Sequence, residues 1–269
     1  MSTHSPVTVL QQIADQVRAR MNEAQALVPK AELAAQIDAS RVPRDFEKIF
    51  TSPGYHVIAE VKLASPSEGV IAPDANPVAV AQDYLAHGAA ALSVLTEQDS
   101  FRGQLQYLKD IRRAFPDAAL LRKDFIVDEY QLLEARVAGA DAVLLIVALL
   151  GGARTHELLE KARALGLSVL VEVHDAEEMH VALNIGASLI GVNNRNLKTL
   201  SISLETSEKL AALVARPGIT LISESGLSRG ADLKHLASLG YRGFLIGSHF
   251  MRTGTPGAAL SKILKEASS

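Results

Sequence analysis

The stretch Ile219–Ser248, ITLISESGLSRGADLKHLASLGYRGFLIGS, contains two short apolar runs that each end in small polar residues. The first run, Ile219–Ser223, leads into Glu-Ser-Gly, and the second, Gly243–Ile246, leads into Gly-Ser. The last two strands of a (β/α)8 barrel end at a rim where backbone N–H groups and a short extra helix commonly bind a phosphate. A lone Gly-Ser also suits an ordinary turn. The pattern therefore predicts a phosphate site only if the whole chain forms such a barrel.

Six further apolar runs lie upstream of these two, and segments with the apolar spacing of a helix separate the eight runs. The strands are predicted at Val57–Lys62, Ala90–Thr96, Leu120–Phe125, Ala142–Val147, Ser168–Val173, Leu189–Asn193, Ile219–Glu224 and Gly243–Gly247. The helices are predicted at Pro77–Ala86, Leu105–Ala114, Asp128–Ala138, Thr155–Leu165, Ala176–Asn184, Leu204–Val214, Gly230–Ser238 and Gly257–Glu266. Consecutive apolar residues are typical of strands buried on both faces. Their alternation with helices implies parallel strands joined by right-handed crossovers.

A weak internal repeat supports closure of the sheet. Gly88, Gly139, Gly186 and Gly240 each end a predicted helix just before every second strand. Glycine is favoured after a helix because it accepts the left-handed conformation. An open, doubly wound sheet could use such glycines as well, but eight nearly uniform units favour a closed one. We therefore expect an α/β fold in which residues 1–269 form one domain, a (β/α)8 TIM barrel.

About 45–50 residues precede the first strand. Ile13 and Val17 stand four residues apart, as do Leu33 and Ile37, which is the spacing of an apolar helical face. We therefore expect residues 1–50 to form a helical extension of the barrel. Either this extension is a flexible or plugging appendage, or part of it caps one mouth of the barrel and lines the site. The sequence alone does not decide between the two.

The composition excludes several classes of function. The chain has 269 residues, 48% of them hydrophobic, with a net charge of −3, 4% aromatic residues, no Trp and no Cys. We therefore expect no nucleic-acid partner, and disulfides, thiolate nucleophiles and Cys-bound zinc are excluded. The longest apolar run, Ala142–Leu150, is too short to span a membrane, and the N-terminus lacks the apolar core of a signal peptide. We expect a cytoplasmic protein, a monomer by default with a weak dimer as the alternative.

Charged and polar side chains follow strand after strand at the carboxyl ends, where the active sites of barrels lie. Glu60 and Lys62 end the first strand and, being two residues apart, face the same side. The others are Arg122, Lys123 and Asp124 on the third strand, Glu172 on the fifth, Asn193 and Arg195 on the sixth, and Glu224 and Ser225 on the seventh. Lysines and carboxylates crowded at one mouth shift one another's pKa, which suits general acid–base catalysis.

Metal and dinucleotide motifs are missing from the sequence. The eight His residues show neither an HxxxH nor an HExxH pattern, and no GxGxxG follows the first strand. His174 is the only one beside a strand end, and we interpret it as a residue of the helix start or of the surface. We therefore predict neither a metal nor a dinucleotide cofactor.

Six segments carry a more specific signal. In order along the chain they are IAEVKLASPS (58–67), LRKDFI (121–126), LVEVH (170–174), GVNNRNL (191–197), SESG (223–226) and FLIGS (244–248). Together they resemble the indole-3-glycerol phosphate synthase family of tryptophan biosynthesis, and the similarity runs from about Val57 to Arg252. The resemblance covers the barrel, and the N-terminal extension also fits it.

The resemblance implies a phosphorylated small-molecule substrate, 1-(2-carboxyphenylamino)-1-deoxyribulose 5-phosphate. An aromatic carbon of this substrate attacks the ketone, CO2 leaves, and then water leaves to give indole-3-glycerol phosphate. Such chemistry needs no metal and no redox cofactor. It needs an acid at the ketone oxygen, a base for the dehydration, a cation near the aromatic carboxylate and a grip on the phosphate.

Matched residue by residue, the resemblance also implies roles. Lys123 is the general acid of ring closure, and Glu172 stabilises the cationic intermediate or acts as the base. Lys62 meets the substrate carboxylate and is the second candidate for the acid, in the dehydration step. Glu60 is a proton relay, with Asn193 as its hydrogen-bonding neighbour. The remaining residues bind substrate: Arg195 at the carboxylate end, Glu224 and Ser225 at the sugar hydroxyls, Ser65, Gly226, Gly247 and Ser248 at the phosphate, and Phe101 and Leu197 on the aromatic ring.

Two residues after the first strand depart from the family's pattern. Leu63 stands where a basic residue is expected, and Glu68 stands where Lys is common. The lost positive charge weakens the attraction of an anionic substrate by about 1 kcal/mol if the position is exposed.

Two other functions are also compatible with a phosphate-binding barrel. One is a class I aldolase, in which Lys62 or Lys123 forms a Schiff base. The other is a sensor of phosphorylated metabolites, or a partner subunit, without activity. Loss of the acid or the base would mark the latter, whereas this sequence retains both lysines together with Glu60 and Glu172.

Overall fold

Eight parallel strands close into a barrel in the computed structural model, which describes residues 9–38, 41–197, 199–214 and 216–269. Around the barrel the order is β1-β10-β9-β8-β7-β6-β5-β4, and pairing of β1 with β4 closes the ring. The strands are β1 (His56–Val61), β4 (Ala91–Leu95), β5 (Leu120–Lys123), β6 (Ala142–Ile146), β7 (Ser168–Val173), β8 (Leu189–Asn193), β9 (Thr220–Glu224) and β10 (Tyr241–Ile246). The expected (β/α)8 barrel is confirmed, and the open sheet is wrong.

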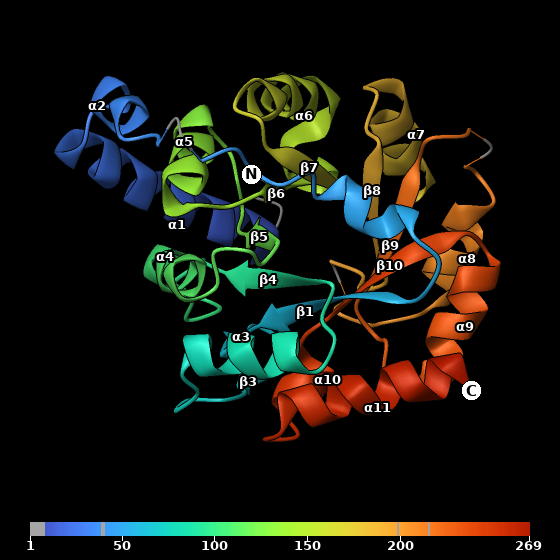
Figure 1. Ribbon diagram of the computed structural model, residues 1–269. Helices are drawn as coiled ribbons and strands as arrows, with labels where there is room; N and C mark the ends of the chain where they lie inside the picture. The colour runs from blue at the N-terminus through green and yellow to red at the C-terminus, as the bar shows by residue number, and fades with distance from the viewer. Residues whose placement is uncertain (1–8, 39–40, 198, 215) are drawn as a thin grey trace, which may run out of the picture.

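Helices surround the strands as an outer layer (Figure 1). They are α3 (Pro77–Ala86), α4 (Leu105–Ala114), α5 (Glu129–Ala138), α6 (Val147–Ala164), α7 (Ala176–Asn184), α8 (Glu205–Ala211), α9 (Gly230–Ser238), α10 (Ser248–Met251) and α11 (Pro256–Ser268). The predicted boundaries were wrong for α6, which begins directly after β6 and is interrupted at Gly151 by a non-helical backbone (φ 66°, ψ 169°). The four repeated glycines all have positive φ, as their position after a helix predicts.

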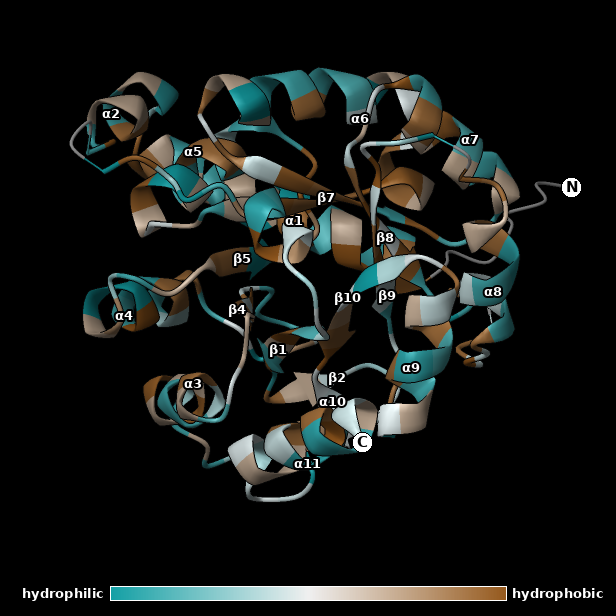
Figure 2. Ribbon diagram, turned by 45° about the vertical axis from the view of Figure 1, so that its right-hand side comes forward, coloured by the Kyte–Doolittle hydropathy of each residue, from teal (hydrophilic) through white to brown (hydrophobic). Residues whose placement is uncertain are grey.

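The strands are buried on both faces, which explains their unbroken apolar sequences. Side chains such as Ile58, Leu121 and Ile222 fill the interior of the barrel. Their neighbours on the strands, such as Val57 and Leu120, belong to a separate and larger cluster that includes residues of the surrounding helices. Figure 2 shows the same division, with hydrophobic strands inside helices of mixed hydropathy. Successive residues of a strand point to opposite faces, so each strand contributes to both clusters.

The N-terminal segment reaches both ends of the barrel. It contains α1 (Val9–Leu27), α2 (Lys30–Ala35) and a 3₁₀ helix, η1 (Glu47–Thr51). Phe46 and Phe50, at η1, are buried with the interior residues of the barrel, and the backbone N–H of Phe46 donates to Ser168 Oγ over 3.2 Å. Residues 1–8 and 39–40 of the expected extension lie outside the described residues.

A buried carboxylate holds the amino ends of the strands. Asp141, just before β6, is inaccessible to solvent and accepts from the guanidinium groups of Arg41 and Arg112, each over 2.5 Å. It also accepts from the backbone N–H groups of Arg44 and Leu120, each over 2.9 Å. A carboxylate at this depth must be paired in this way, because an unpaired buried charge is strongly destabilising. The cluster ties the N-terminal segment to the barrel at the end opposite the carboxyl ends of the strands.

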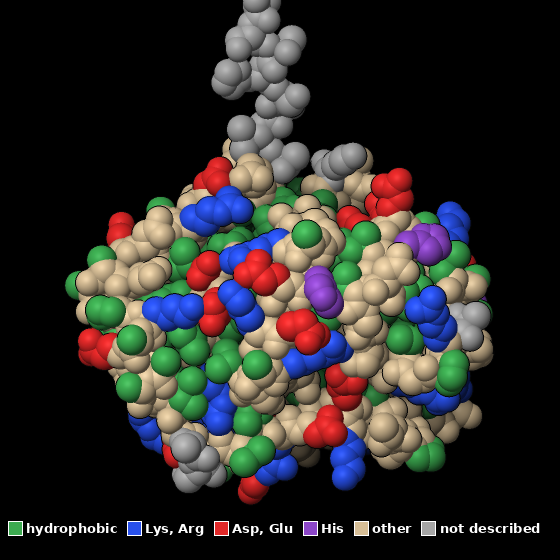
Figure 3. Space-filling model, turned by 90° about the horizontal axis from the view of Figure 1, so that it is seen from above, with side chains coloured by type: hydrophobic (Ala, Val, Ile, Leu, Met, Phe, Trp, Pro, Cys, Tyr) green, Lys and Arg blue, Asp and Glu red, His purple; other side chains and the backbone are tan. Residues whose placement is uncertain are grey.

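In the described part of the chain, no helix is long and apolar enough to cross a membrane. Figure 3 shows one face of the molecule, where basic and acidic side chains are interspersed among apolar ones. Such a mixed surface gives no broad field of one sign for a polyanion to recognise.

Candidate active site

A pocket of about 370 Å³ opens at the carboxyl ends of the strands. Its lining includes every residue to which the resemblance gives a role: Glu60, Lys62, Ser65, Phe101, Lys123, Glu172, Asn193, Arg195, Leu197, Glu224, Ser225, Gly226, Gly247 and Ser248. The structure thus brings together residues from seven βα units that lie far apart in the sequence. Parallel strands place all their carboxyl ends on the same rim, so the shared location follows from barrel closure.

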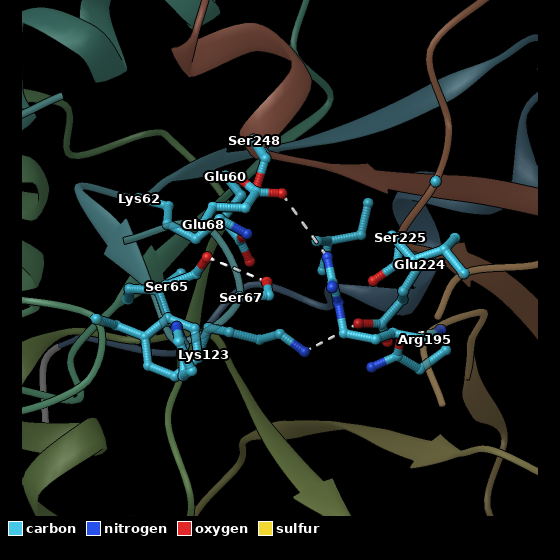
Figure 4. A pocket seen from close by; sticks show the side chains of 18 of the residues that line it. Glu60, Lys62, Ser65, Ser67, Glu68, Lys123, Arg195, Glu224, Ser225 and Ser248 are labelled. Atoms are coloured by element: carbon cyan, nitrogen blue, oxygen red, sulfur yellow. Dashed lines mark hydrogen bonds and ion pairs between the residues drawn. The ribbon is translucent and has the colours of Figure 1, made fainter. Parts of the chain in front are cut away.

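The ammonium group of Lys123, at the end of β5, lies between two carboxylates. Its Nζ donates to Glu172 Oε2 over 2.7 Å and to Glu224 Oε2 over 2.9 Å (Figure 4). Burial lowers the pKa of Lys123, but the charges of Glu172, Glu224 and Glu60 outweigh burial and raise it above its ordinary value. Lys123 is therefore protonated in the unliganded pocket.

The two carboxylates around Lys123 differ in their surroundings. Burial raises the pKa of Glu172, but Lys123 and His174 outweigh it, and the pKa is well below its usual range. Lys123 is the one cation within 4.0 Å of Glu224 among the described residues, and burial together with the charge of Glu172 raises the pKa of Glu224 to about 7. Within the described residues, Oε1 of Glu224 has no hydrogen-bond donor, which also disfavours its ionised form.

His174 completes the surroundings of Glu172, and its assignment to the surface was wrong. Its Nε2 lies 3.2 Å from Glu172 Oε1, and its Nδ1 lies 3.0 Å from Glu178 Oε2. The imidazole is largely buried between these carboxylates, which overcome the effect of burial and raise the pKa of His174 to about 10. Asn193 Nδ2 donates to the same Glu172 oxygen over 3.2 Å, so its hydrogen-bonding neighbour is Glu172 and not Glu60 as expected. The sequence signal was the position of His174, two residues after Glu172 and just before α7.

Glu60 and Lys62 form a second ion pair across the pocket. Lys62 Nζ lies 2.7 Å from Glu60 Oε1, and Ser93 Oγ donates to Glu60 Oε2 over 3.3 Å. Gly247 makes room for this carboxylate, because a Cβ at that position would lie 2.5 Å from Glu60 Oε1. The closing glycine of β10 is thus required by the packing of Glu60.

The turn after β9 presents Ser225 and Gly226 to the pocket in an unusual backbone conformation. Both residues have positive φ, 68° and 83°, and Ser225 is one of only three non-glycine residues in the described chain to do so. Asn194 supports the turn, because its Nδ2 donates to the backbone carbonyls of Glu224 and Ser225 over 3.0 and 3.1 Å. Asn194 was not among the residues predicted for the site, although the Asn-Asn pair of GVNNRNL was a signal for it.

One side of the pocket is apolar and includes the N-terminal helix. Phe101 packs against Phe125, with ring centroids 6.0 Å apart, and Val9, Leu10 and Ile13 of α1 line the pocket with them. The extension therefore lines the site, and the alternative of a mere appendage is wrong for α1. Leu197 from the loop after β8 adds to this apolar lining.

A buried carboxylate that the sequence analysis missed connects α1 to the loop of Phe101. Glu97 accepts from the backbone N–H of Phe101 over 3.1 Å and from that of Ser100 over 2.8 Å. On the other side, Arg20 Nη2 of α1 donates to Glu97 Oε1 over 2.8 Å. The signal for Glu97 in the sequence was the pair of acidic residues, Glu97 and Asp99, shortly after an apolar strand. Glu97 thus orders the loop and holds α1 over it.

The neighbours of Lys123 do not share its role. Arg122 points outwards, away from the pocket, and donates to Glu134 Oε2 of α5 over 3.1 Å and to the carbonyl of Gln131 over 2.7 Å. Asp124 touches the pocket, but its carboxylate pairs with Arg122 over 2.9 Å and accepts from Thr96 over 2.5 Å. These two charges hold α5 and the loop after β4 against the barrel.

Comparison with known proteins relates the whole chain to one family. A family model described as indole-3-glycerol phosphate synthase matches residues 10–263. The chain is 48% identical over 239 residues to the indole-3-glycerol phosphate synthase of Laribacter hongkongensis, covering 87% of this chain and 90% of that protein. It is 45% identical over 259 residues to the protein of that name from Acidithiobacillus ferrooxidans, covering 95% and 98%.

Solved structures of similar fold are much more distant in sequence. KGPDC from Streptococcus mutans superposes with a TM-score of 0.61 at 13% identity, covering 80% of this chain and 98% of that one. A mandelate oxidase mutant with a monooxide FMN adduct superposes with a TM-score of 0.61 at 19% identity, covering 86% and 78%. At these identities the likeness concerns the barrel fold alone.

Proposed function

The chain belongs to the indole-3-glycerol phosphate synthase family, and we propose how the residues of its pocket close the indole ring. The activity is that of a carbon–carbon lyase of tryptophan biosynthesis. It converts 1-(2-carboxyphenylamino)-1-deoxyribulose 5-phosphate into indole-3-glycerol phosphate, with loss of CO2 and water. The observation that carries the assignment of roles is the buried ammonium of Lys123 held between Glu172 and Glu224 at the centre of the pocket.

Lys123 is the acid of the first step. The ring carbon that bears the carboxylate forms a bond to the ketone carbon, and the ketone oxygen takes a proton from Nζ to become a hydroxyl. The resting ammonium has a raised pKa, which makes it a poor donor as long as both carboxylates accept from it. When the sugar hydroxyls occupy Glu224, Lys123 loses one of its two acceptors and becomes a stronger acid.

Glu172 stabilises the positive charge that ring closure creates. With its low pKa it stays ionised, and Lys123, His174 and Asn193 fix both of its oxygens. A carboxylate fixed before the reaction stabilises a developing cation without reorganising. After CO2 has left and restored the aromatic ring, the same carboxylate can accept a proton from the new five-membered ring.

Lys62 binds the aromatic carboxylate of the substrate, and together with Glu60 it acts in the dehydration. Lys62 lines the pocket and meets the aromatic carboxylate, with Arg195 as the second cation at that end. Lys62 Nζ, which lies 2.7 Å from Glu60 Oε1, can donate a proton to the hydroxyl that leaves as water. This division makes Lys123 the acid of ring closure and Lys62 the acid of dehydration.

The remaining residues hold the two ends of the substrate. Phe101 and Leu197 contribute the apolar wall for the aromatic ring, and Ser225 with Glu224 faces the sugar hydroxyls. The phosphate lies against four small residues of three loops, Ser65, Gly226, Gly247 and Ser248. Small side chains there let the anion approach backbone N–H groups closely.

The surroundings of Lys123 argue against a Schiff base on that lysine, and the set of groups in the pocket argues against a sensor. A Schiff-base lysine must be a free amine and is usually activated by a lowered pKa, whereas the pKa of Lys123 is raised. A sensor would not need a lysine held between two carboxylates, together with a second lysine–glutamate ion pair in the same pocket. The lyase accounts for all of these groups.

Incubation of the purified protein with the carboxyphenylamino-deoxyribulose phosphate tests the proposal, with indole absorbance and fluorescence as the readout. We expect turnover in the wild type and a fall in kcat of about 10²–10⁴-fold in Lys123→Ala, with phosphate binding retained. Glu172→Gln should lower kcat more than it raises KM, because its charge acts on the intermediate. Borohydride trapping of an adduct on either lysine would instead support the aldolase.

We propose further that residues 1–269 act as one domain, with residues 1–50 as its helical extension, and that the chain works as a cytoplasmic monomer. Arg20 and the Asp141 cluster support the first point, because both tie the extension to the barrel. Sedimentation of the purified protein tests the second, since a weak dimer would show a mass that rises with concentration.

A further inference from the structure

The cations of the pocket are all paired with carboxylates of the protein itself. The pocket lining, as far as the chain is described, contains four Lys and Arg residues. Their partners within 4.0 Å are Glu60 for Lys62, Glu172 and Glu224 for Lys123, and Glu68 for both Arg195 and Arg252. A substrate with a phosphate and a carboxylate therefore competes with these partners for the cations of the pocket.

Glu68 is the partner in the least constrained position. It lies in the turn between two short strands, β2 (Ala64–Ser65) and β3 (Gly69–Val70), which follow β1. The other three carboxylates are at most 3% exposed and sit at the carboxyl ends of barrel strands. The side chain of Glu68 is 19% exposed and that of Arg252 is 60% exposed. An ion pair so open to water is weak and breaks more easily than the buried ones.

The geometry around Glu68 matches that of a bound anion. Both guanidinium groups approach the same oxygen, Oε1, with Arg252 Nη2 at 2.6 Å and Arg195 Nη2 at 3.8 Å. Oε2 is buried and has no hydrogen-bond donor in the described chain. Figure 4 shows Glu68 inside the pocket together with Ser65, Ser67 and Ser248, three of the hydroxyl side chains that line it. A carboxylate therefore stands beside the groups assigned to the phosphate.

We propose that Arg252 is a phosphate-binding residue, and that the carboxylate of Glu68 competes with the substrate's phosphate for the guanidinium group of Arg252. The inference rests on the phosphate position given above. Two phosphate oxygens can engage the guanidinium group of Arg252 where Glu68 offers one, so a dianionic phosphate displaces the carboxylate more readily than a monoanion does. Glu68 thereby raises the KM and favours doubly charged ligands.

The hairpin has room for the displaced side chain. A Cβ at Gly69 would have no atom within 4 Å, and Val70 is exposed. We infer that the displaced side chain of Glu68 turns towards this open space, within the β2–β3 hairpin and outside the barrel strands.

Removal of the charge tests the proposal. We expect Glu68→Gln to lower the KM for the substrate and the inhibition constant of inorganic phosphate by about three- to tenfold, with a smaller change in kcat. Glu68→Lys should lower both further, because it adds a cation. The matched control is Glu205→Gln, which removes an exposed ion pair with Lys209 outside the pocket and should change neither constant.

A second substitution separates competition from a general charge effect. Arg252→Ala should weaken phosphate binding by about tenfold, and Glu68→Gln should then change it less than twofold in that background, because the shared arginine is gone. Calorimetric titration with inorganic phosphate measures this without turnover. Weaker phosphate binding in Glu68→Gln, or no change, would overturn the proposal. Turnover by the wild type tests the lyase separately, so the two results stay distinct.

Discussion

Gly191 of β8 lies directly against the carboxylate of Glu224 on the neighbouring strand β9. A Cβ at position 191 would stand 2.0 Å from Glu224 Oε1, closer than any pair of unbonded atoms can approach. The carboxylate can reach Lys123 from β9 because β8 has no side chain at this point. A residue without any chemistry of its own thus decides where a functional carboxylate lies.

Gly191→Ala should therefore reduce activity by displacing Glu224. We expect kcat to fall about 10–100-fold, since loss of about 1–3 kcal/mol in positioning corresponds to that range. Steady-state kinetics measure the effect, and circular dichroism checks that the barrel is folded. The matched control is Gly243→Ala in β10, where a Cβ would meet Ile222 Cδ1 at 2.4 Å, away from the carboxylates. It should lose stability but keep its kcat, and equal losses of kcat in both variants would contradict the positioning role.

His174 should make stability depend on pH. Its pKa is about 10 in the folded protein against an ordinary value of 6.5, so the folded state binds the proton more tightly. The contribution of its charge is fully present below pH 6.5 and is lost as the pH rises from 6.5 to about 10. Urea unfolding should show His174→Asn less stable than the wild type by roughly 2–4 kcal/mol at pH 6 and by much less at pH 10.

The control for His174 is another histidine that pairs with a glutamate. His235 Nε2 lies 2.8 Å from Glu208 Oε1, but both side chains are exposed. His235→Asn should change the free energy of unfolding by less than about 1 kcal/mol at either pH. A pH-independent loss in His174→Asn would show that its packing matters rather than its charge.

The N-terminal helix should contribute to substrate affinity. Ile13 is buried and lines the pocket, whereas Leu27 of the same helix is exposed. Ile13→Ser should raise the KM about tenfold, because a buried apolar side chain contributes on the order of 1.5–3 kcal/mol to the contacts that it makes. Leu27→Ser should leave the KM unchanged. If both variants behave like the wild type, α1 is only a structural cover.

Asp141 should matter for stability and not for chemistry. It lies at the amino ends of the strands, where its carboxylate neutralises Arg41 and Arg112. Asp141→Ala leaves these cations without their partner and should destabilise the fold by about 3–5 kcal/mol. Asp117→Ala is the control, because that carboxylate is 96% exposed although it also pairs with an arginine. At a temperature where both variants are folded, kcat should equal that of the wild type.

Much of the site could be predicted from the sequence because two regularities act together. Apolar runs of strand length alternating with helices predict the barrel, and a barrel places the charged ends of its strands on one rim. This is why Lys123, Glu172 and Glu224, which are about 50 residues apart, were expected in one pocket and all line it. Their catalytic roles remain predictions.

The sequence by itself determined the order of the elements and the set of polar groups at the carboxyl rim, because short periodic patterns encode both. Only the tertiary structure decided that Lys123 faces inwards and Arg122 outwards, since alternation along a strand leaves the choice of face open. It also decided that His174 is buried against Glu172 and that Arg20 holds α1 to Glu97. The local patterns at His174 and Glu97 mark charged residues near strand ends, but which partners these residues contact depends on how the surrounding elements pack.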